Sequence, residues 1–149
     1  MFNLTKTTVA AGIIALAALG GATPAMAGQC SAAGANPLAN APTMPKDVTD
    51  TVLAAVDLGS EINVDGRQLR TRRLVVQPGG VVPMHSHKDR PALIVTVSGS
   101  ITEYSSACAA PIEHKAGDIS READGLSHYW VNRGKVPAVL LSSDVFHGM

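Results

Sequence analysis

The sequence has no excess of charge of either sign, since 12 lysines and arginines face 12 aspartates and glutamates. A chain without a basic surplus has no electrostatic reason to bind nucleic acid or an anionic membrane surface. It also lacks a Ser-His-Asp spacing, a glycine-rich phosphate loop and a Cys-x-x-Cys pair. Serine-hydrolase chemistry and nucleotide chemistry therefore have no support in the sequence.

Long apolar runs are also missing, because the one apolar stretch, residues 9–22, is too short for a stable membrane-spanning helix. It follows Lys6 and precedes Ala25-Met26-Ala27, the small-x-small pattern of a secretory cleavage site. We expect residues 1–27 to be a signal peptide and the mature protein to be periplasmic or secreted. An uncleaved membrane anchor is the alternative. Loss of Lys6 leaves 11 basic and 12 acidic residues, a net charge of −1.

Cysteine is scarce, with Cys30 and Cys108 as the only two. An exported protein meets an oxidising compartment, where an even pair tends to form a disulfide. We therefore expect these two residues to pair. Two free thiols, or a thiol near a metal, are the alternatives, because sequence cannot supply the geometry.

Convincing helical periodicity is absent, whereas 14 glycines and nine prolines favour turns. We expect an irregular arm over residues 28–47 and a single domain over residues 48–149. Expected strands cover residues 47–58, 69–76, 92–98, 101–105, 112–114, 127–132 and 136–145, with turns at 64–67 and 77–80. Short strands separated by regular turn signals predict an all-β sandwich or barrel.

The stretch over residues 79–99 combines a glycine-rich turn, His85-Ser86-His87, a charged loop and a β-rich apolar run. Alternate side chains of a strand share one face, so His85 and His87 project to the same side. Neutral imidazole is a strong ligand for first-row metals, and a rigid strand presets the spacing. By itself this pair is a candidate metal site and no more.

A second stretch, residues 117–132, contains a third informative histidine, His128. The two stretches together resemble the two cupin motifs in order and spacing, over about residues 69–146. The matching positions are Gly79, His85, His87 and Gly99 in the first motif and Gly117, Gly125, His128 and Asn132 in the second. The resemblance implies an all-β double-stranded β-helix, or jelly-roll barrel, in which His85, His87 and His128 are the metal ligands.

Two positions depart from the cupin motifs. The proline of the second motif is Ala123, which we expect only to relax a turn. The glutamate of the first motif is absent, because Pro91 and Ala92 occupy its place. Asp89, water or substrate are the candidate replacements, and some cupin dioxygenases have a three-histidine site. Such a site suits a divalent transition metal, namely iron, manganese, nickel, copper or zinc.

Two side chains near the histidines are candidate substrate contacts. Arg90 follows His87 and is able to bind a carboxylate through two hydrogen bonds, with a solvated loop arginine as the alternative. Trp130 shares the strand parity of His128 and is a candidate wall of a substrate pocket, with plain core packing as the alternative.

Other polar residues have plainer interpretations. A basic cluster is interpreted as a solvated strand face, with an anion patch as the alternative; it consists of Arg67, Arg70, Arg72 and Arg73. Glu103 is expected to be an exposed hairpin carboxylate, with a base near the metal as the alternative. His114 and His147 are expected at the surface or at strand ends.

The sequence supports three functional hypotheses. The first is a metal-dependent enzyme, an oxygenase (dioxygenase-like) or isomerase, acting on a small molecule. The second is a periplasmic metal- or ligand-binding module without turnover, and the third is a structural or sensory barrel with a vestigial site. Fold analogy cannot separate them, because one barrel hosts many chemistries. The expected partner is a small-molecule ligand or substrate, and a homodimer is left open.

Overall fold

The computed structural model describes residues 37–147, so the predicted signal peptide and Cys30 lie outside the described residues. Strands dominate this part of the chain, with one short helix, α1 (Leu58–Ile62). The strands are β1 (Lys46–Asp57), β2 (Arg67–Ser86), β3 (Ala92–Ser98), β4 (Ser100–Ser105), β5 (Ile112–Lys115), β6 (Ile119–Glu122), β7 (Ser127–Val131) and β8 (Ala138–His147). Among the described residues, no helix has the length and apolar character needed to cross a membrane.

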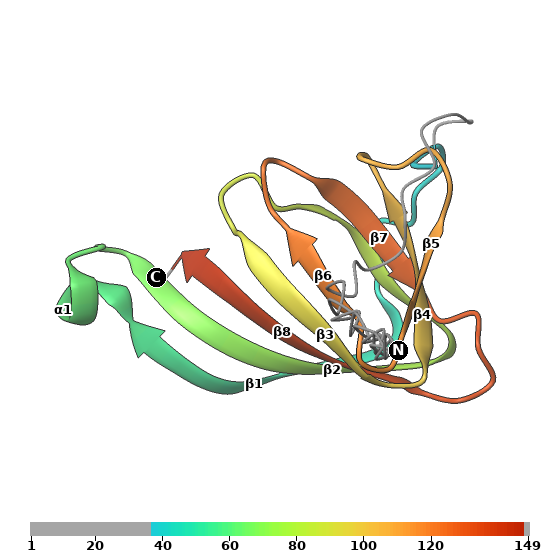
Figure 1. Cartoon of the computed structure of the whole chain (residues 1–149), viewed down its shortest axis with the longest axis horizontal. Helices are drawn as coiled ribbons and strands as arrows, with labels where there is room; N and C mark the ends of the chain where they lie inside the picture. Colours follow the sequence, from blue (N-terminus) through green and yellow to red (C-terminus); the bar gives the residue numbers. More distant parts are fainter. Residues whose placement is uncertain (1–36, 148–149) are drawn as a thin grey trace, which may run out of the picture.

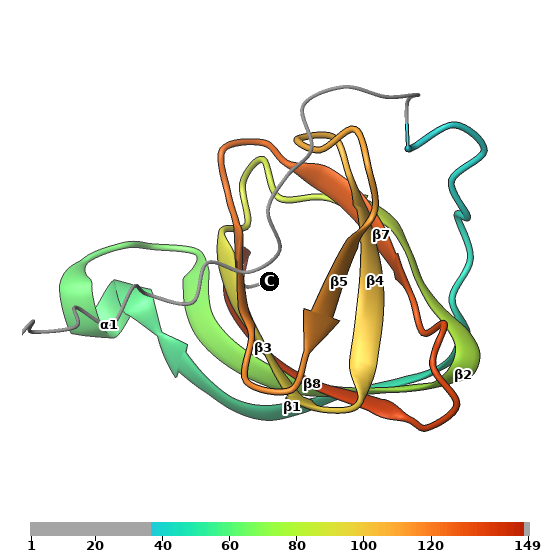
Figure 2. The ribbon, with the colours of Figure 1, turned by 45° about the vertical axis from the view of Figure 1, so that its right-hand side comes forward.

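The strands form an antiparallel sheet that curls into a nearly closed barrel (Figures 1 and 2). Its strand order is β5-β4-β7-β2-β8-β3-β6, with β1 paired to the free side of β2. The all-β barrel predicted from the sequence is thus confirmed. Consecutive strands are often not neighbours in the sheet, which is how residues distant in the sequence meet inside the barrel.

Strand β2 is longer than the sequence analysis predicts, because it runs through Pro78, Gly79 and Gly80 instead of ending there. Gly79 adopts a φ of +76°, and its N–H donates to the carbonyl of Asn132. Over residues 67–76 β2 pairs with β1 and β8, and over residues 81–86 it pairs with β7. The two glycines therefore bend one strand from one partner to another. This bend brings the end of β2 against β7.

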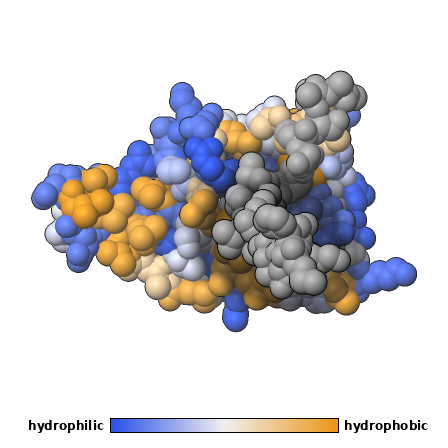
Figure 3. Space-filling view, viewed as in Figure 1, coloured by the Kyte–Doolittle hydropathy of each residue, from blue (hydrophilic) through white to orange (hydrophobic). Residues whose placement is uncertain are grey.

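Helix α1 was not predicted from the sequence. Asp57 caps its start by accepting a hydrogen bond from the Gly59 N–H at 2.7 Å, and Asn63 ends it in the left-handed conformation. Strand β1 begins at Lys46, two residues inside the arm that we expected over residues 28–47. With the first half of β2, β1 and α1 project beyond the barrel (Figure 1). This projection carries much of the hydrophobic surface in Figure 3. Its exposed apolar side chains include Val52, Leu53, Val56 and Ile62.

The barrel interior is divided between apolar and polar side chains. Its apolar part consists of Leu74, Val76, Ala92, Ile94, Ile101, Trp130, Ala138 and Leu140. Buried polar residues include His87, Glu103, His114, Glu122, His128, Asn132 and Asp144. Buried ionisable groups are costly unless they are paired. Their concentration in one barrel marks the candidate site.

Candidate metal centre

Three histidines converge inside the barrel. His85 lies near the end of β2, directly opposite His128 of β7 in the ladder, and His87 follows the end of β2. The Nε2 atoms are 3.0 Å apart for His85 and His87, 3.1 Å for His87 and His128, and 3.0 Å for His85 and His128. The structure therefore brings together the three residues that the sequence proposed as metal ligands.

Backbone carbonyls fix the protonation of two of these rings. The Nδ1 of His85 lies 2.8 Å from the Pro83 carbonyl, and the Nδ1 of His87 lies 2.7 Å from the Arg90 carbonyl. A carbonyl only accepts, so each Nδ1 carries the proton and each Nε2 presents a lone pair. Burial lowers the pKa of His85 to about 3 and that of His87 to about 4, with repulsion from His128 contributing to both shifts. Both rings are neutral at pH 7, the form that binds metals.

The dimensions of the triangle suit a metal ion. Two ligands about 2.1 Å from a metal and at right angles to each other are about 3.0 Å apart. The three Nε2 atoms therefore fit one face of an octahedron, which leaves the opposite positions for other ligands. Without a cation or a shared proton, lone pairs this close would repel one another.

His128 differs from the other two histidines because carboxylates face its Nδ1. Glu103 of β4 lies 3.0 Å from this Nδ1 through Oε1, and its Oε2 lies 2.8 Å from the Nε2 of His114. Burial raises the pKa of Glu103, but the hydrogen bonds from His114 and His128 outweigh it and hold the value at about 2. Glu103 therefore stays ionised and orients the His128 ring.

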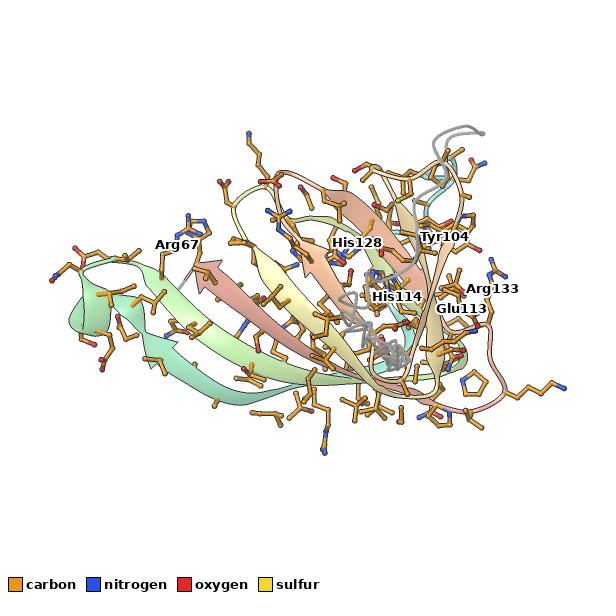
Figure 4. All side chains as sticks on the ribbon, viewed as in Figure 1. Arg67, Tyr104, Glu113, His114, His128 and Arg133 are labelled. Atoms are coloured by element: carbon orange, nitrogen blue, oxygen red, sulfur yellow. The ribbon has the colours of Figure 1, made fainter. Side chains whose placement is uncertain are left out.

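The sequence analysis was wrong about Glu103 and His114, which are only 3% and 2% exposed. His114 lies inside the barrel with His128, whereas Glu113 and Arg133 lie outside it (Figure 4), and Glu103 contacts both of these histidines. A signal was available in β4, where Ile101, Glu103 and Ser105 alternate with half-buried residues. The apolar Ile101 sets the inward face, and period-two alternation then places Glu103 on it.

A second carboxylate, Glu122 of β6, approaches the same nitrogen of His128. Its Oε1 accepts a hydrogen bond from the Ser120 hydroxyl, and its Oε2 lies 3.4 Å from the His128 Nδ1. Burial and the neighbouring Glu103 raise the pKa of Glu122. The sequence analysis did not single out Glu122. Asp89, which it considered as a replacement ligand, is exposed in the loop after β2.

Trp130 joins the histidines to the core. It is 2% exposed, its indole Nε1 lies 2.8 Å from the His128 Nδ1, and its ring stacks on that of His114 with 5.0 Å between the ring centroids. Trp130 also borders the cavity described below. The two alternatives raised by the sequence, pocket wall and core packing, therefore describe the same side chain.

A cavity of about 240 Å³ opens over the three histidines. Its apolar walls are Leu74, Val82, Pro83, Ile94, Trp130 and Leu140, and its remaining polar lining is Asp50, Arg72, Arg90 and Ser142. The cavity is thus an apolar chamber with imidazoles on one part of its surface and guanidinium groups on another. This combination suits a small ligand with one charged end.

The two arginines of the cavity, Arg72 and Arg90, and the neighbouring Arg70 are held by one buried carboxylate, Asp144. Its Oδ2 lies 2.9 Å from Arg70, 3.5 Å from Arg72 and 3.6 Å from Arg90. Burial raises the pKa of Asp144, but Arg70 and Arg72 lower it further, and the net shift is downward. Arg72 also pairs with Asp50. Three guanidinium groups against two carboxylates leave one positive charge in excess beside the cavity.

The predicted solvated strand face is wrong for Arg70 and Arg72, whose side chains are 13% and 14% exposed. Their parity on β2 matches that of Leu74, which turns them into the barrel. Arg73 is exposed, and Arg67 donates to the Asp89 carbonyl.

Cys108 is buried in the loop after β4, and Cys30 lies outside the described residues. The predicted disulfide therefore stays a prediction.

Comparisons with known proteins agree with the barrel fold. Residues 72–144 match the family described as "Cupin domain". Germin-like protein 1 of Brassica napus is 34% identical over 103 residues, which cover 65% of this chain and 50% of that protein. Auxin-binding protein ABP19b of Prunus persica is 35% identical over 83 residues, covering 54% and 40%. This chain spans about half the length of the curated relatives it matches.

A solved structure gives the same fold. It is titled a predicted oxalate decarboxylase from Thermotoga maritima, and it matches with a TM-score of 0.55 and 17% identity. The match covers 72% of this chain and 95% of that one. At this identity the likeness concerns the fold alone.

Proposed function

Residues 72–144 of this chain form a cupin domain, and from this premise we propose that the protein is an exported cupin that binds a divalent transition metal. The proposed ligands are His85, His87 and His128. The observation that supports the proposal is the triangle of Nε2 atoms about 3 Å apart. In His85 and His87 the Nδ1 atom contacts a backbone carbonyl, which leaves the Nε2 lone pair free for a metal. Iron, manganese, nickel, copper and zinc all suit imidazole ligands.

We propose oxygenase- or isomerase-type chemistry on a small planar molecule that is anionic or phenolic. A bound ion would supply Lewis-acid or redox chemistry at its open positions. Apolar side chains form much of the cavity wall, and among them Trp130 and Ile94 flank the ligand. Arg90 and Arg72 attract its anionic end, because together with Arg70 they exceed the charge of the carboxylates Asp50 and Asp144 by one. The auxin-binding name of one relative also supports a small organic ligand.

A second candidate is a periplasmic metal- or small-ligand-binding module without turnover. One observation favours it, namely that the carboxylate lining the cavity, Asp50, is already paired with Arg72. Besides the histidines, the cavity lining then offers no unpaired base to move a proton on a substrate. Export in either case is supported by the leader pattern of residues 1–27.

Metal analysis of the purified protein tests the proposal. We expect about one ion per chain in the wild type, and loss of most of it in His85→Ala, His87→Ala or His128→Ala, since two imidazoles make a poor site. His147→Ala, at the exposed end of β8, is the matched control and should keep its metal. Stoichiometric metal in each of the three single variants would show that the site lies elsewhere.

Oxygen uptake together with analysis of substrate conversion, which also detects an isomerase, separates the two candidate functions. A panel of diols, phenols and thiols is offered to the metal-loaded wild type, with the His128→Ala protein as the blank. Turnover of any member that depends on His128 supports the enzyme. A metal-loaded wild type that is inert across the panel favours the binding module.

A further inference from the structure

The position that carries glutamate in the first cupin motif is filled by Ala92 here, and its neighbour in the sheet is a glutamate. Ala92 opens β3, and its ladder partner on β6 is Glu122. Both residues face into the barrel, at 6% and 1% exposure. Side chains opposite each other in an antiparallel pair lie about 5 Å apart at Cβ. A carboxylate is thus present one strand away from the place where the motif has it.

Glu122 is poorly satisfied by the residues around it. Its Oε2 is buried and has no hydrogen-bond partner, and the Glu103 carboxylate is close enough to disfavour its charge. The groups that face it are Ser120, Glu103, His114 and His128. None of these is a lysine or an arginine. A buried carboxylate in such surroundings lowers the stability of the fold. A positive charge nearby would offset this cost, and none of these side chains carries a permanent one.

The ring of His128 connects Glu122 to the proposed metal position. The Glu122 Oε2 lies 3.4 Å from Nδ1 and the Glu103 Oε1 lies 3.0 Å from it, while Nε2 on the other side faces His85 and His87. A carboxylate that accepts the Nδ1 proton makes the imidazole a more basic ligand at Nε2. His85 and His87 have only neutral carbonyls in the corresponding place. His128 is therefore the one ligand of the three whose Nδ1 faces carboxylates.

We propose that Glu122, acting with Glu103 through the ring of His128, supplies the negative charge that the absent motif glutamate would bring to the metal. Glu122 is then a positioning residue of the metal site and not itself a ligand. The cupin motif has its carboxylate at the position of Ala92, whereas this chain has one at Glu122, the ladder partner of Ala92 on β6. This inference rests on the proposed metal site.

Metal affinity of the Glu122→Gln protein tests the inference. The substitution keeps the size of the side chain and removes its charge. Competition against a chromophoric chelator, with Mn²⁺ and Zn²⁺ as the probes, should give a Kd that is about 10- to 100-fold weaker than in the wild type. Glu113→Gln on β5, whose side chain is 56% exposed, is the control and should leave the Kd unchanged.

Two further readouts distinguish this role from a structural one. The electron paramagnetic resonance spectrum of bound Cu²⁺ should change in Glu122→Gln, because the donor strength of His128 changes. In metal-free protein, the thermal midpoint of Glu122→Gln should equal or exceed that of the wild type, since an unsatisfied buried carboxylate is removed. A lowered midpoint together with an unaltered Cu²⁺ spectrum would mean that Glu122 serves packing alone.

The double variant Ala92→Glu/Glu122→Ala returns the carboxylate to the motif position, and it also serves if Glu122→Gln does not fold. We expect it to bind metal at least as tightly as Glu122→Gln and within a few-fold of the wild type, whereas Glu122→Ala alone should bind weakly. A Kd of Glu122→Gln within twofold of the wild type overturns the inference, and so does a folded double variant that binds no better than Glu122→Ala. A wild type that binds neither ion overturns the proposed function instead.

Discussion

The charged side chains inside the barrel form two groups near the histidines, one of carboxylates and one of arginines. Carboxylates lie behind His128, and guanidinium groups lie beside the cavity. Asp144 is fully buried and is shared by Arg70, Arg72 and Arg90, so it limits how far each arginine is able to move. An anionic ligand that enters the cavity meets arginines that are already oriented, which lowers the entropy cost of binding.

Arg90→Ala should weaken the binding of an anionic ligand without changing metal content. Loss of one charge-assisted hydrogen bond costs about 1.5 to 3 kcal/mol, which corresponds to an increase in KM or Kd of roughly 10- to 150-fold. The measurement is a titration of the best ligand from the oxygen-uptake panel, with metal content determined on the same samples. Arg73→Ala, on the outer face of β2, should leave both values unchanged. An unaltered KM in Arg90→Ala would exclude Arg90 as a ligand contact.

At the residue scale, the sequence predicted the convergence of His85, His87 and His128, because strand parity and motif spacing are both visible in it. It did not predict that Glu103, His114 and Glu122 are buried. Polar residues of this kind are usually exposed, and a prediction from polarity therefore places Glu103 and His114 at the surface. Strand alternation would have placed Glu103 on the inward face. The burial of Glu103 is explained only by its partners, His114 on β5, the next strand, and His128 on β7, which lies 25 residues further along the chain.

Among the elements, β2 decides the architecture. Its glycines were interpreted as a stop signal, since Pro-Gly-Gly commonly marks a turn. In the barrel they serve as a bend, because the Gly79 N–H and the Gly80 carbonyl stay hydrogen-bonded to Asn132. A Cβ on Gly80 would lie 2.8 Å from the carbonyls of Asp47 and Gln77, so this position requires glycine. Whether a Pro-Gly-Gly segment ends a strand or bends it depends on the strands that pair with it, here β1, β7 and β8, and the local sequence does not show which strands these are.

Two motif glycines should differ in how well they tolerate alanine. Gly99 has a φ of +72°, and a Cβ there would lie 2.6 Å from the Pro137 carbonyl. Gly117 has a φ of +96° and open space around it. Gly117→Ala should cost only the backbone strain, about 1 to 2 kcal/mol. Gly99→Ala should cost about 1 to 3 kcal/mol more, because packed backbone must move.

Urea unfolding of the two metal-free variants measures this difference as a change in the free energy of unfolding. Equal losses in Gly99→Ala and Gly117→Ala would show that the contact with Pro137 is relieved without cost.

For the whole molecule, stability should depend on pH through two imidazoles, the half-buried His85 and the buried His87. The pKa of His85 is lowered to about 3 and that of His87 to about 4, from 6.5 in the unfolded chain. Between these values the unfolded state binds more protons, so the metal-free protein should lose stability as the pH falls from about 6.5 toward 4. The raised pKa of Glu122 acts in the opposite direction, but one carboxyl opposes two imidazoles.

Urea midpoints of chelator-treated protein, measured from pH 7 to pH 4.5, check this dependence. A flat or rising midpoint as the pH falls would contradict the assignment of neutral, buried rings.

The predicted disulfide also concerns the whole chain, because Cys30 and Cys108 are far apart in sequence. Closing a loop of this length stabilises the fold by roughly 4 kcal/mol in the chain-entropy model. Thiol titration of exported protein, unfolded without reductant, should detect no free sulfhydryl. Two thiols per chain would rule the disulfide out.

Trp130 gives the molecule an optical property of its own, since it is the sole tryptophan of the chain. Its indole N–H contacts His128, and its ring stacks on His114, so its excited state senses the electronic condition of both imidazoles. Occupation of the site should therefore alter the intensity of emission without any added dye. Because no other indole contributes background, equilibrium titrations and stopped-flow kinetics of metal loading can be followed in unlabelled protein.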